Sequence, residues 1–256
     1  MNMIQNQLFI DGEFVDAESK ARIPVLNPHD NSLITEVAEA QKADIDRAVE
    51  AARKAFPAWS KMAAADRGRL LLKLADAIDA NADELAKLES LDTGHPLRDT
   101  RGLDVVRTAV TFRYFGGMAD KFQGSVVPVE QGFLNYVLRE PVGVVGQIVP
   151  WNFPLMFTSW KMGPALAAGN TVVMKPAELT PLSSLRVAAL AREVGFPKGV
   201  MNIVPGYGNV AGQYLAEHAG VDKIAFTGST AVGRSCRLPA ATSSGCSSSW
   251  AARAPT

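Results

Sequence analysis

Polar residues that could take part in catalysis or binding stand directly after two short apolar segments of the chain. Asn152 lies in the turn Pro150-Trp151-Asn152-Phe153-Pro154, where flanking prolines hold the carboxamide so that its NH2 group can donate to an oxyanion. Lys175 and Glu178 stand three residues apart, and together they can donate to and accept from ribose hydroxyls. The ordinary alternatives are a helix cap at Asn152 and a solvated charge at Lys175.

Glycine-rich turns follow two further apolar segments. The run from Gly206 to Gly212, GYGNVAG, resembles a dinucleotide-binding fingerprint with one residue too many before its last glycine. The run FTGSTAVG places Gly228 and Ser229 where a helix begins, and free N–H groups at a helix start bind phosphate. A plain cap is the alternative there. The sequence thus offers two places for the phosphates of a nucleotide.

The elements that position these residues follow from the hydrophobic pattern. Short β-branched segments predict strands over 142–149, 171–175, 200–204 and 223–226, with helices over 155–168, 182–194 and 210–217 and another from Ser229. Strands that alternate with helices indicate parallel βαβ units, so the predicted fold class is α/β with a Rossmann-like parallel sheet and flanking helices. Ligands of such sheets bind beyond the carboxyl ends of the strands, where the turns above lie.

The region before this sheet has a different pattern. Asp11 and Gly12 between Leu8–Ile10 and Phe14–Val15 predict a β-hairpin. Apolar residues at spacings of three and four predict helices between 42 and 92 and from about 100 to 120, and residues 134–138 have an extended pattern. We therefore expect a hairpin and helices over 1–120 that pack on a nucleotide-binding region over 141–234.

Composition narrows the class of protein. The 26 basic residues balance the 26 acidic ones, so no charge excess favours nucleic acid or an anionic membrane. Two cysteines and three histidines predict neither a disulfide framework nor a metal site. The sequence has no apolar run long enough for a membrane helix and no secretory leader at its start, so we expect a cytoplasmic protein.

The four turns together, IVPWNFP, MKPAE, PGYG and FTGSTAVG in this order and spacing, resemble the NAD(P)-dependent aldehyde dehydrogenase superfamily from about Leu8 to Arg234. The resemblance implies that Asn152 stabilises an oxyanion and that Lys175 and Glu178 contact the adenosine ribose. Glu178 would repel a 2′-phosphate, which favours NAD over NADP. The resemblance assigns to the nucleotide cleft Gly208, Gly212, Phe226, Gly228, Ser229 and Val232, with Ile148, Val149, Pro150 and Trp151 along its floor.

The resemblance also implies an activity, a substrate and an assembly. In this superfamily a cysteine thiolate attacks an aldehyde, the thiohemiacetal passes hydride to the nicotinamide, and a glutamate activates water to release a carboxylic acid. Phe153 and Trp160 fall on the helix that lines the aldehyde tunnel, although aromatic residues at helical spacing are usually ordinary core. Residues 121–140 match part of an oligomerisation hairpin, so a homo-oligomer is expected of the full-length family.

The sequence departs from the superfamily after Arg234. The tail over 235–256 is rich in serine, and neither Cys236 nor Cys246 stands in the superfamily's cysteine motif. Suitable codons for Ser249–Thr256, when read one base earlier, encode Glu-Leu-Gly-Gly-Lys, the motif expected next. We therefore expect a lost reading frame, an absent catalytic domain, a disordered tail and a chain without activity of its own. An exposed sheet edge and apolar surface then predict aggregation.

Two other classes of protein compete with this interpretation. A non-catalytic nucleotide-binding or subunit-interaction fragment would bind NAD without turnover. A short-chain dehydrogenase is disfavoured because the sequence has no Tyr-x-x-x-Lys pair: Met118, Glu140, Ala211 and His218 stand four residues after its tyrosines.

Overall fold

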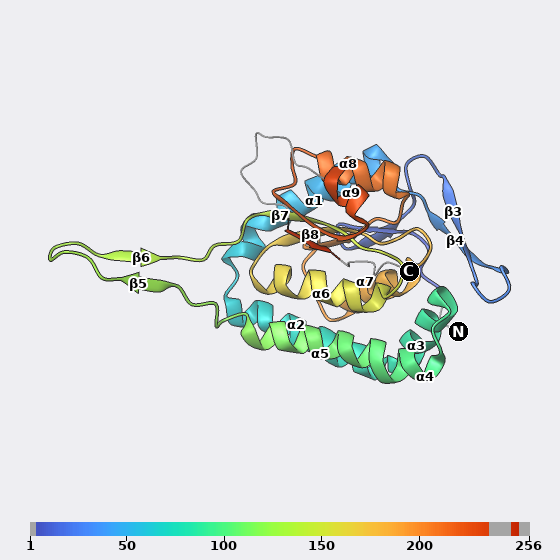
Figure 1. Ribbon diagram of the computed structural model, residues 1–256, viewed down its shortest axis with the longest axis horizontal. Coiled ribbons are helices and arrows are strands. Elements are labelled where there is room, and N and C mark those ends of the chain that lie inside the picture. Colours follow the sequence, from blue (N-terminus) through green and yellow to red (C-terminus); the bar gives the residue numbers. More distant parts are fainter. Residues whose placement is uncertain (1–3, 236–246, 251–256) are drawn as a thin grey trace.

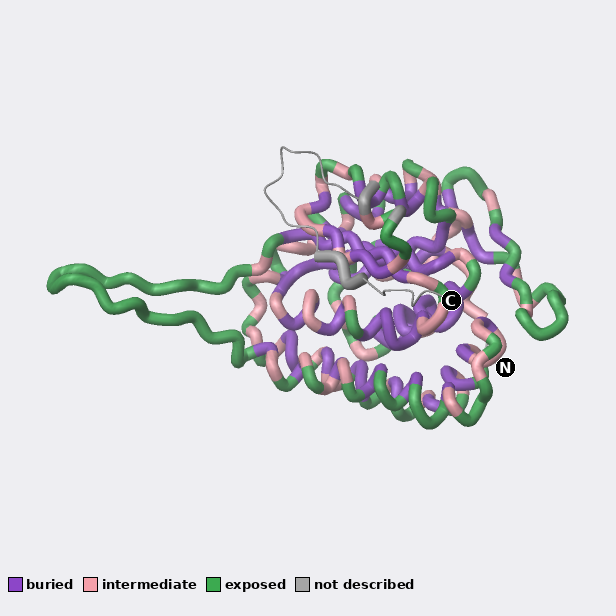
Figure 2. The backbone as a smooth tube through the Cα atoms, viewed as in Figure 1, coloured by how far each residue is buried: buried purple, intermediate pink, exposed green. Residues whose placement is uncertain are grey.

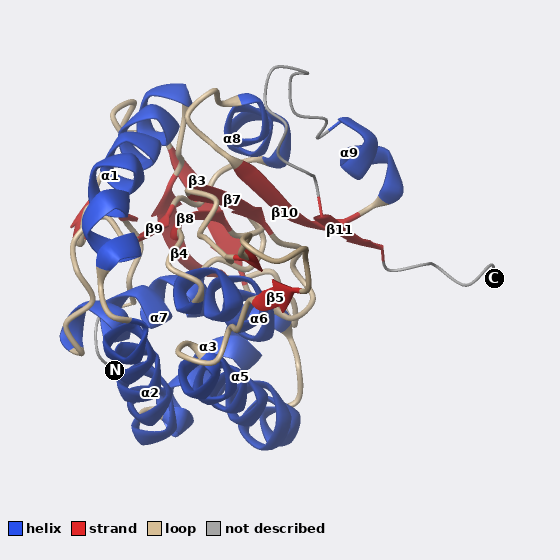
Figure 3. Cartoon of the chain, turned by 90° about the vertical axis from the view of Figure 1, so that its left-hand side faces the viewer, coloured by secondary structure: helices blue, strands red, loops and turns tan. Residues whose placement is uncertain are grey.

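A seven-stranded mixed sheet lies at the centre of the molecule and has helices on both faces (Figure 1, Figure 3). The computed structural model describes residues 4–235 and 247–250. The sheet has the order β11-β10-β7-β8-β9-β1-β2. Its strands are β1 (Leu8–Ile10), β2 (Glu13–Val15), β7 (Val144–Ile148), β8 (Thr171–Lys175), β9 (Met201–Ile203), β10 (Lys223–Gly228) and β11 (Ser247–Trp250).

The four predicted strands form most of the parallel part of this sheet, to which β11 also belongs. β7 pairs in parallel with β8 on one side and β10 on the other, and β8 pairs in parallel with β9. Every residue of β7 and β8 is buried, as expected for a parallel sheet that is covered on both faces. The expected α/β fold with a Rossmann-like sheet and flanking helices is confirmed.

The N-terminal hairpin joins the main sheet. β1 and β2 pair around Asp11 and Gly12, which both have a positive φ, as this tight turn requires. β1 also pairs antiparallel with β9 through Phe9 and Ile203. The hairpin was predicted from its turn, but its attachment to β9, almost two hundred residues further along the chain, was not. A second hairpin, β3 (Arg22–Leu26) with β4 (Leu33–Ala38), stands apart from the main sheet.

Helices form a layer on each face of the sheet (Figure 3). One layer holds α1 (Lys42–Lys61), α8 (Gln213–Glu217) and α9 (Thr230–Ser235). The other holds α2 (Ala64–Ala80), α3 (Ala82–Thr93), α5 (Val105–Met118), α6 (Pro154–Ala167) and α7 (Leu182–Glu193). The short helix α4 (Leu97–Asp99) and a π-helical turn over Thr100–Asp104 lead into α5. Each layer buries its own cluster of apolar side chains against the sheet.

Two further segments bear on the expected domain boundaries. The strands β5 (Ser125–Val127) and β6 (Asn135–Val137) pair as an arm that projects from the body with its residues exposed (Figure 1, Figure 2). In the tail, Ser247–Trp250 pair in parallel with β10 as β11. The remaining tail positions, 236–246 and 251–256, lie outside the described residues.

In the described part of the chain no helix has the length and apolar character to span a bilayer.

Candidate nucleotide-binding site

The carboxyl ends of the parallel strands bring the predicted turns to one edge of the sheet. The chain runs from β7 through β8 to β9 in one direction, and β10 then lies on the opposite side of β7. The strand order therefore reverses between β7 and β10. In open α/β sheets this point of reversal leaves a crevice outside the strand ends, where ligands bind.

A cavity of about 330 Å³ lies at this reversal point. The predicted cleft residues that line it are Ile148, Gly208, Gly212 and Val232, and the other lining residues are Asn209, Gln213, Ala216 and Glu217. The glycine fingerprint did not predict this second group. Gln213 and Glu217 follow Asn209 at intervals of four, so the helical period of this segment was the available signal.

Lys175 lies at the end of β8 beside the glycine turn. Its side chain is buried, and its Nζ donates to Glu178 Oε2 at 2.9 Å. Burial lowers the pKa of Lys175, and the neighbouring Glu178 carboxylate opposes that shift. A Cβ atom added to Gly208 would lie 3.9 Å from the Lys175 Nζ, and one added to Gly212 would lie 3.7 Å from its Cδ. Both glycines thus place backbone without a side chain beside a paired cation and carboxylate, and Gly208 is exposed whereas Gly212 is buried.

The turn after β7 is held from β8 and the following loop. Val149 donates its backbone N–H to the carbonyl of Lys175 at 3.2 Å. The hydroxyl of Thr180 donates to the carbonyl of Trp151 at 3.0 Å, while the Trp151 side chain is exposed. Asn152 is half-buried, and its carboxamide makes no hydrogen bond within the part of the chain that the structure describes. Pro150 precedes this exposed stretch and is likewise half-buried.

Of the predicted cleft residues at and after the end of β10, Val232 lines the cavity, whereas Phe226, Gly228 and Ser229 do not. Phe226 is buried, and its ring lies so close to Gly228 that an added Cβ would be 2.5 Å from Phe226 Cζ. The hydroxyl of Ser229 accepts the backbone N–H of Val232 at 3.4 Å, and the Ser229 carbonyl accepts that of Gly233 at 3.0 Å. Ser229 therefore caps α9, which is the alternative interpretation that the sequence left open for this turn.

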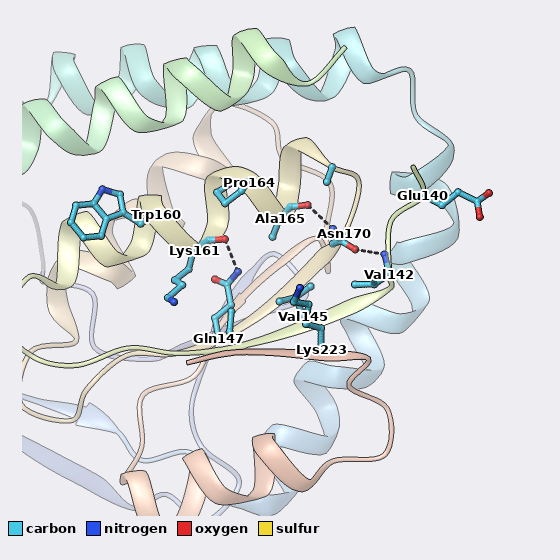
Figure 4. A pocket seen from close by; sticks show the side chains of 12 residues that line it. Glu140, Val142, Val145, Gln147, Trp160, Lys161, Pro164, Ala165, Asn170 and Lys223 are labelled. Atoms are coloured by element: carbon cyan, nitrogen blue, oxygen red, sulfur yellow. Dashed lines mark hydrogen bonds between the residues drawn. The ribbon is translucent and has the colours of Figure 1, made fainter. Parts of the chain in front are cut away.

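The two aromatic residues expected to line an aldehyde tunnel lie in different surroundings. The Phe153 ring packs on His95 with 5.0 Å between ring centroids. Trp160, on α6, lines a second cavity of about 450 Å³ on the α6 face of the sheet, together with Lys161 and Gln147 (Figure 4). Phe153 is not among the residues that line that cavity.

The Lys161 ammonium in the second cavity is partly buried. Gln147 donates from Nε2 to the carbonyl of Lys161 at 2.8 Å, which fixes it beneath α6 (Figure 4). Burial lowers the pKa of Lys161, whose ammonium donates to the carbonyl of Phe226 at 3.4 Å. Within the described residues no group of three or more His, Cys, Asp or Glu side chains is arranged to hold a metal ion.

The fold and the cleft define an α/β protein with a nucleotide-type site at the strand reversal. Comparison with known proteins identifies the family more narrowly. The family model described as "Aldehyde dehydrogenase family" matches residues 14–245. The chain belongs to the aldehyde dehydrogenase family. The match extends beyond Arg234, where we expected the resemblance to stop.

Relatives and solved structures agree with this assignment. The chain is 51% identical over 241 residues to "Aldehyde dehydrogenase, mitochondrial" of Mesocricetus auratus, an alignment that covers 93% of this chain and 48% of the relative. A putative aldehyde dehydrogenase from Burkholderia cenocepacia is similar in structure, with 73% identity, a TM-score of 0.91 and coverage of 91% of this chain and 48% of that chain.

A solved NAD+ complex is also similar. The aldehyde dehydrogenase from Bacillus cereus in complex with NAD+ has a TM-score of 0.93 and 45% identity, with 98% of this chain and 52% of that chain covered. The chain therefore spans about half the length of the relatives that it matches.

Proposed function

We propose that the cavity at the strand reversal binds NAD, and that a chain of this family that carries the site together with the family's cysteine motif oxidises an aldehyde to a carboxylic acid. One observation carries the proposal: the Lys175–Glu178 pair lies beside Gly208 and Gly212 at the edge of the cavity. Glycine backbone suits a close approach by a dinucleotide, and a cation paired with a carboxylate suits ribose hydroxyls.

Each wall of the cleft has a role in this proposal. Ile148 and Val232 line the cavity and provide apolar surface for the adenine end. Val149, Pro150 and Trp151 are proposed to form the floor that leads from the cavity toward Asn152. Glu178 accepts from a ribose hydroxyl and repels a 2′-phosphate, which favours NAD over NADP. Phe226, Gly228 and Ser229 are proposed to form the far wall. The bound cofactor supplies the hydride acceptor.

Asn152 is the residue of this chain that acts on the aldehyde. Its carboxamide NH2 donates to the oxygen that becomes negatively charged when a thiolate adds to the aldehyde carbon. The absence of a competing hydrogen bond to this carboxamide within the described residues supports that role. Phe153, which precedes α6, and Trp160, within α6, are proposed to border the aldehyde path, although they do not line one cavity here.

The 256 residues considered alone support binding rather than turnover. They contain the nucleotide cleft and Asn152, but neither Cys236 nor Cys246 stands in the family's cysteine motif. Both cysteines lie outside the described residues. We infer that this chain binds NAD without oxidising aldehydes, and the frame change that we expect in the tail is decided by sequencing the gene from the codon of Gly228 onward. The cytoplasmic location also stays a prediction, since a relative is named as mitochondrial.

The exposed β5–β6 arm supports a second proposal, that the chain associates with copies of itself. The arm is exposed along both of its strands and the turn between them (Figure 2), and it carries large apolar residues that are exposed. They are Val126, Val127, Val129, Phe133, Leu134, Tyr136, Val137 and Leu138. A concentration of exposed apolar residues of this kind is typical of a protein interface or an aggregation site. The subunit-interaction fragment therefore remains the competing function.

Calorimetric titration of the chain with NAD and with NADP tests the first proposal. We expect NAD to bind, NADP to bind more weakly, and propanal, as a simple test aldehyde, to give no NADH. Asn152→Ala is the matched variant, and it should leave NAD affinity within a factor of two or so. Absence of NAD binding would refute the proposed site. NADH formation that Asn152→Ala abolishes would refute the inference that the chain is inactive alone.

A further inference from the structure

Two buried carboxylates of α3 lie against the first turns of the two helices that follow the site turns. Glu89 and Asp92 are 0% and 2% exposed. Glu89 Oε1 accepts the backbone N–H of Leu155, near the start of α6, at 3.2 Å. Asp92 Oδ2 accepts the backbone N–H of Leu182, the first residue of α7, at 2.9 Å.

Neither α6 nor α7 is capped by the residue that precedes it. Phe153 and Pro181 occupy those positions, and the side chain of neither makes a capping hydrogen bond. The first N–H groups of a helix have no partner inside the helix, so a buried helix start needs an acceptor from elsewhere. Glu89 and Asp92 supply these acceptors from 66 and 90 residues away in the sequence.

The capped helix starts are continuous with the turns of the nucleotide site. Leu155 is three residues after Asn152, and Leu182 is four residues after Glu178. The turns are also joined to each other, because Thr180 donates to the carbonyl of Trp151. Acceptors that both belong to the rigid helix α3 thus fix both turns in one frame.

A side-chain hydrogen bond also joins α6 and α7 near their starts. The hydroxyls of Thr158, in α6, and Ser184, in α7, are 2.8 Å apart and both buried. A displacement of one helix start therefore moves the other. The two caps on α3 act on a connected unit that contains Asn152 and Glu178.

The loop after α3 contacts the same unit from a second side. His95 packs on the ring of Phe153, and its Nδ1 lies 3.0 Å from Asp104 Oδ2. The hydroxyl of Ser90 donates to the carbonyl of His95 at 2.7 Å, which holds this loop on α3. Contacts at Phe153 and Leu155 therefore clamp the turn on both sides of Pro154.

We propose that Glu89 and Asp92 are positioning residues of the nucleotide site, which cap α6 and α7 and thereby set the turns that carry Asn152 and the Lys175–Glu178 pair. The link to NAD rests on the proposed function, whereas the capping itself does not. The cost of these groups supports a dedicated role: burial raises the pKa of Glu89 to about 7 and that of Asp92 well above its usual range. An apolar residue would avoid that cost but could not accept the N–H groups.

Amide hydrogen exchange of single variants tests the caps. Glu89→Met and Asp92→Met remove the acceptors, whereas Glu89→Gln and Asp92→Asn retain a carbonyl oxygen. We expect exchange to become roughly fivefold to thirtyfold faster at 151–156 in Glu89→Met and at 178–184 in Asp92→Met, with near wild-type rates in the amide variants. Thr108→Val is the matched control, because Thr108 is buried and its hydroxyl donates to the carbonyl of Asp104.

NAD affinity tests the positioning role. We expect NAD to bind roughly fivefold to thirtyfold more weakly to both methionine variants, within about twofold of wild type to the amide variants, and normally to Thr108→Val. Uniformly faster exchange along the chain, or locally faster exchange with unchanged NAD affinity, would overturn the proposal. A wild-type chain that does not bind NAD would refute the proposed function, and the local exchange pattern would still decide the caps. Each variant carries one substitution. If a variant at Glu89 does not fold, the variants at Asp92 still test the proposal, and the reverse also holds.

Discussion

The Glu89 carboxyl predicts an unusual dependence of stability on pH. Burial raises its pKa from an ordinary 4.5 to about 7, and the Ser183 hydroxyl and the Leu155 N–H oppose the shift. The folded chain therefore binds a proton at Glu89 over a pH range in which the unfolded chain has released it. Stability from this group is present at low pH and is lost as the pH rises from about 4.5 to about 7.

The size of the effect follows from the separation of the two pKa values. Each pH unit across that interval changes the free energy of unfolding by about 1.4 kcal/mol, so the whole interval corresponds to about 3 kcal/mol. Glu89→Gln does not titrate and keeps the acceptor for Leu155. We expect wild type to lose about 3 kcal/mol relative to Glu89→Gln between pH 4.5 and pH 8.

Urea unfolding at several pH values measures this difference. The other ionisable groups of the cluster are Asp92, Asp104 and His95, and they are present in both proteins. Any constant cost of the glutamine cancels in the difference between pH values. Parallel profiles for wild type and Glu89→Gln would refute the reasoning, because they would show that Glu89 has the same proton occupancy in the folded and unfolded chains.

Three further predictions concern the site, the packing and the arm. Lys175→Met should weaken NAD binding about tenfold or more without lowering stability, since it removes a desolvated cation; calorimetric titration and thermal melting measure the two effects. Gly68→Ala should cost roughly 1–3 kcal/mol in urea unfolding, because its Cβ would lie 2.5 Å from the Gly116 carbonyl oxygen between α2 and α5, whereas exposed Gly117→Ala, with nothing within 4 Å, should not destabilise the chain. Phe133→Ser with Leu134→Ser should reduce self-association in light scattering while leaving the melting temperature unchanged, because both side chains are about three-quarters exposed.

The local sequence pattern was sufficient to predict most of the helices and strands and some of the residues that line the cleft. The predicted strand over 171–175 agrees with β8, and the Asp11-Gly12 turn forms the predicted hairpin. Ile148, Gly208, Gly212 and Val232 meet in one cavity because each follows or ends a parallel strand whose order is set by the chain. Period and turn residues carry such information within a few neighbouring positions.

Other features depend on segments that are far apart in the sequence. The attachment of β1 to β9, the pairing of Ser247–Trp250 with β10 and the separate surroundings of Phe153 and Trp160 were all missed. Edge pairing is set by which backbone groups remain free after the rest of the sheet has formed, and a local pattern does not record them.

The sequence by itself determined the family, the parallel strands and the residues that stand at their ends. Only the tertiary structure decided that Glu89 and Asp92, on a helix with no recognisable motif, cap α6 and α7 beneath those residues. The physical reason is that an unpaired N–H at a buried helix start can donate to any correctly placed oxygen, however distant that oxygen is in the chain. Local sequence shows that Phe153 and Pro181 provide no cap, and the packing of α3 determines what replaces it.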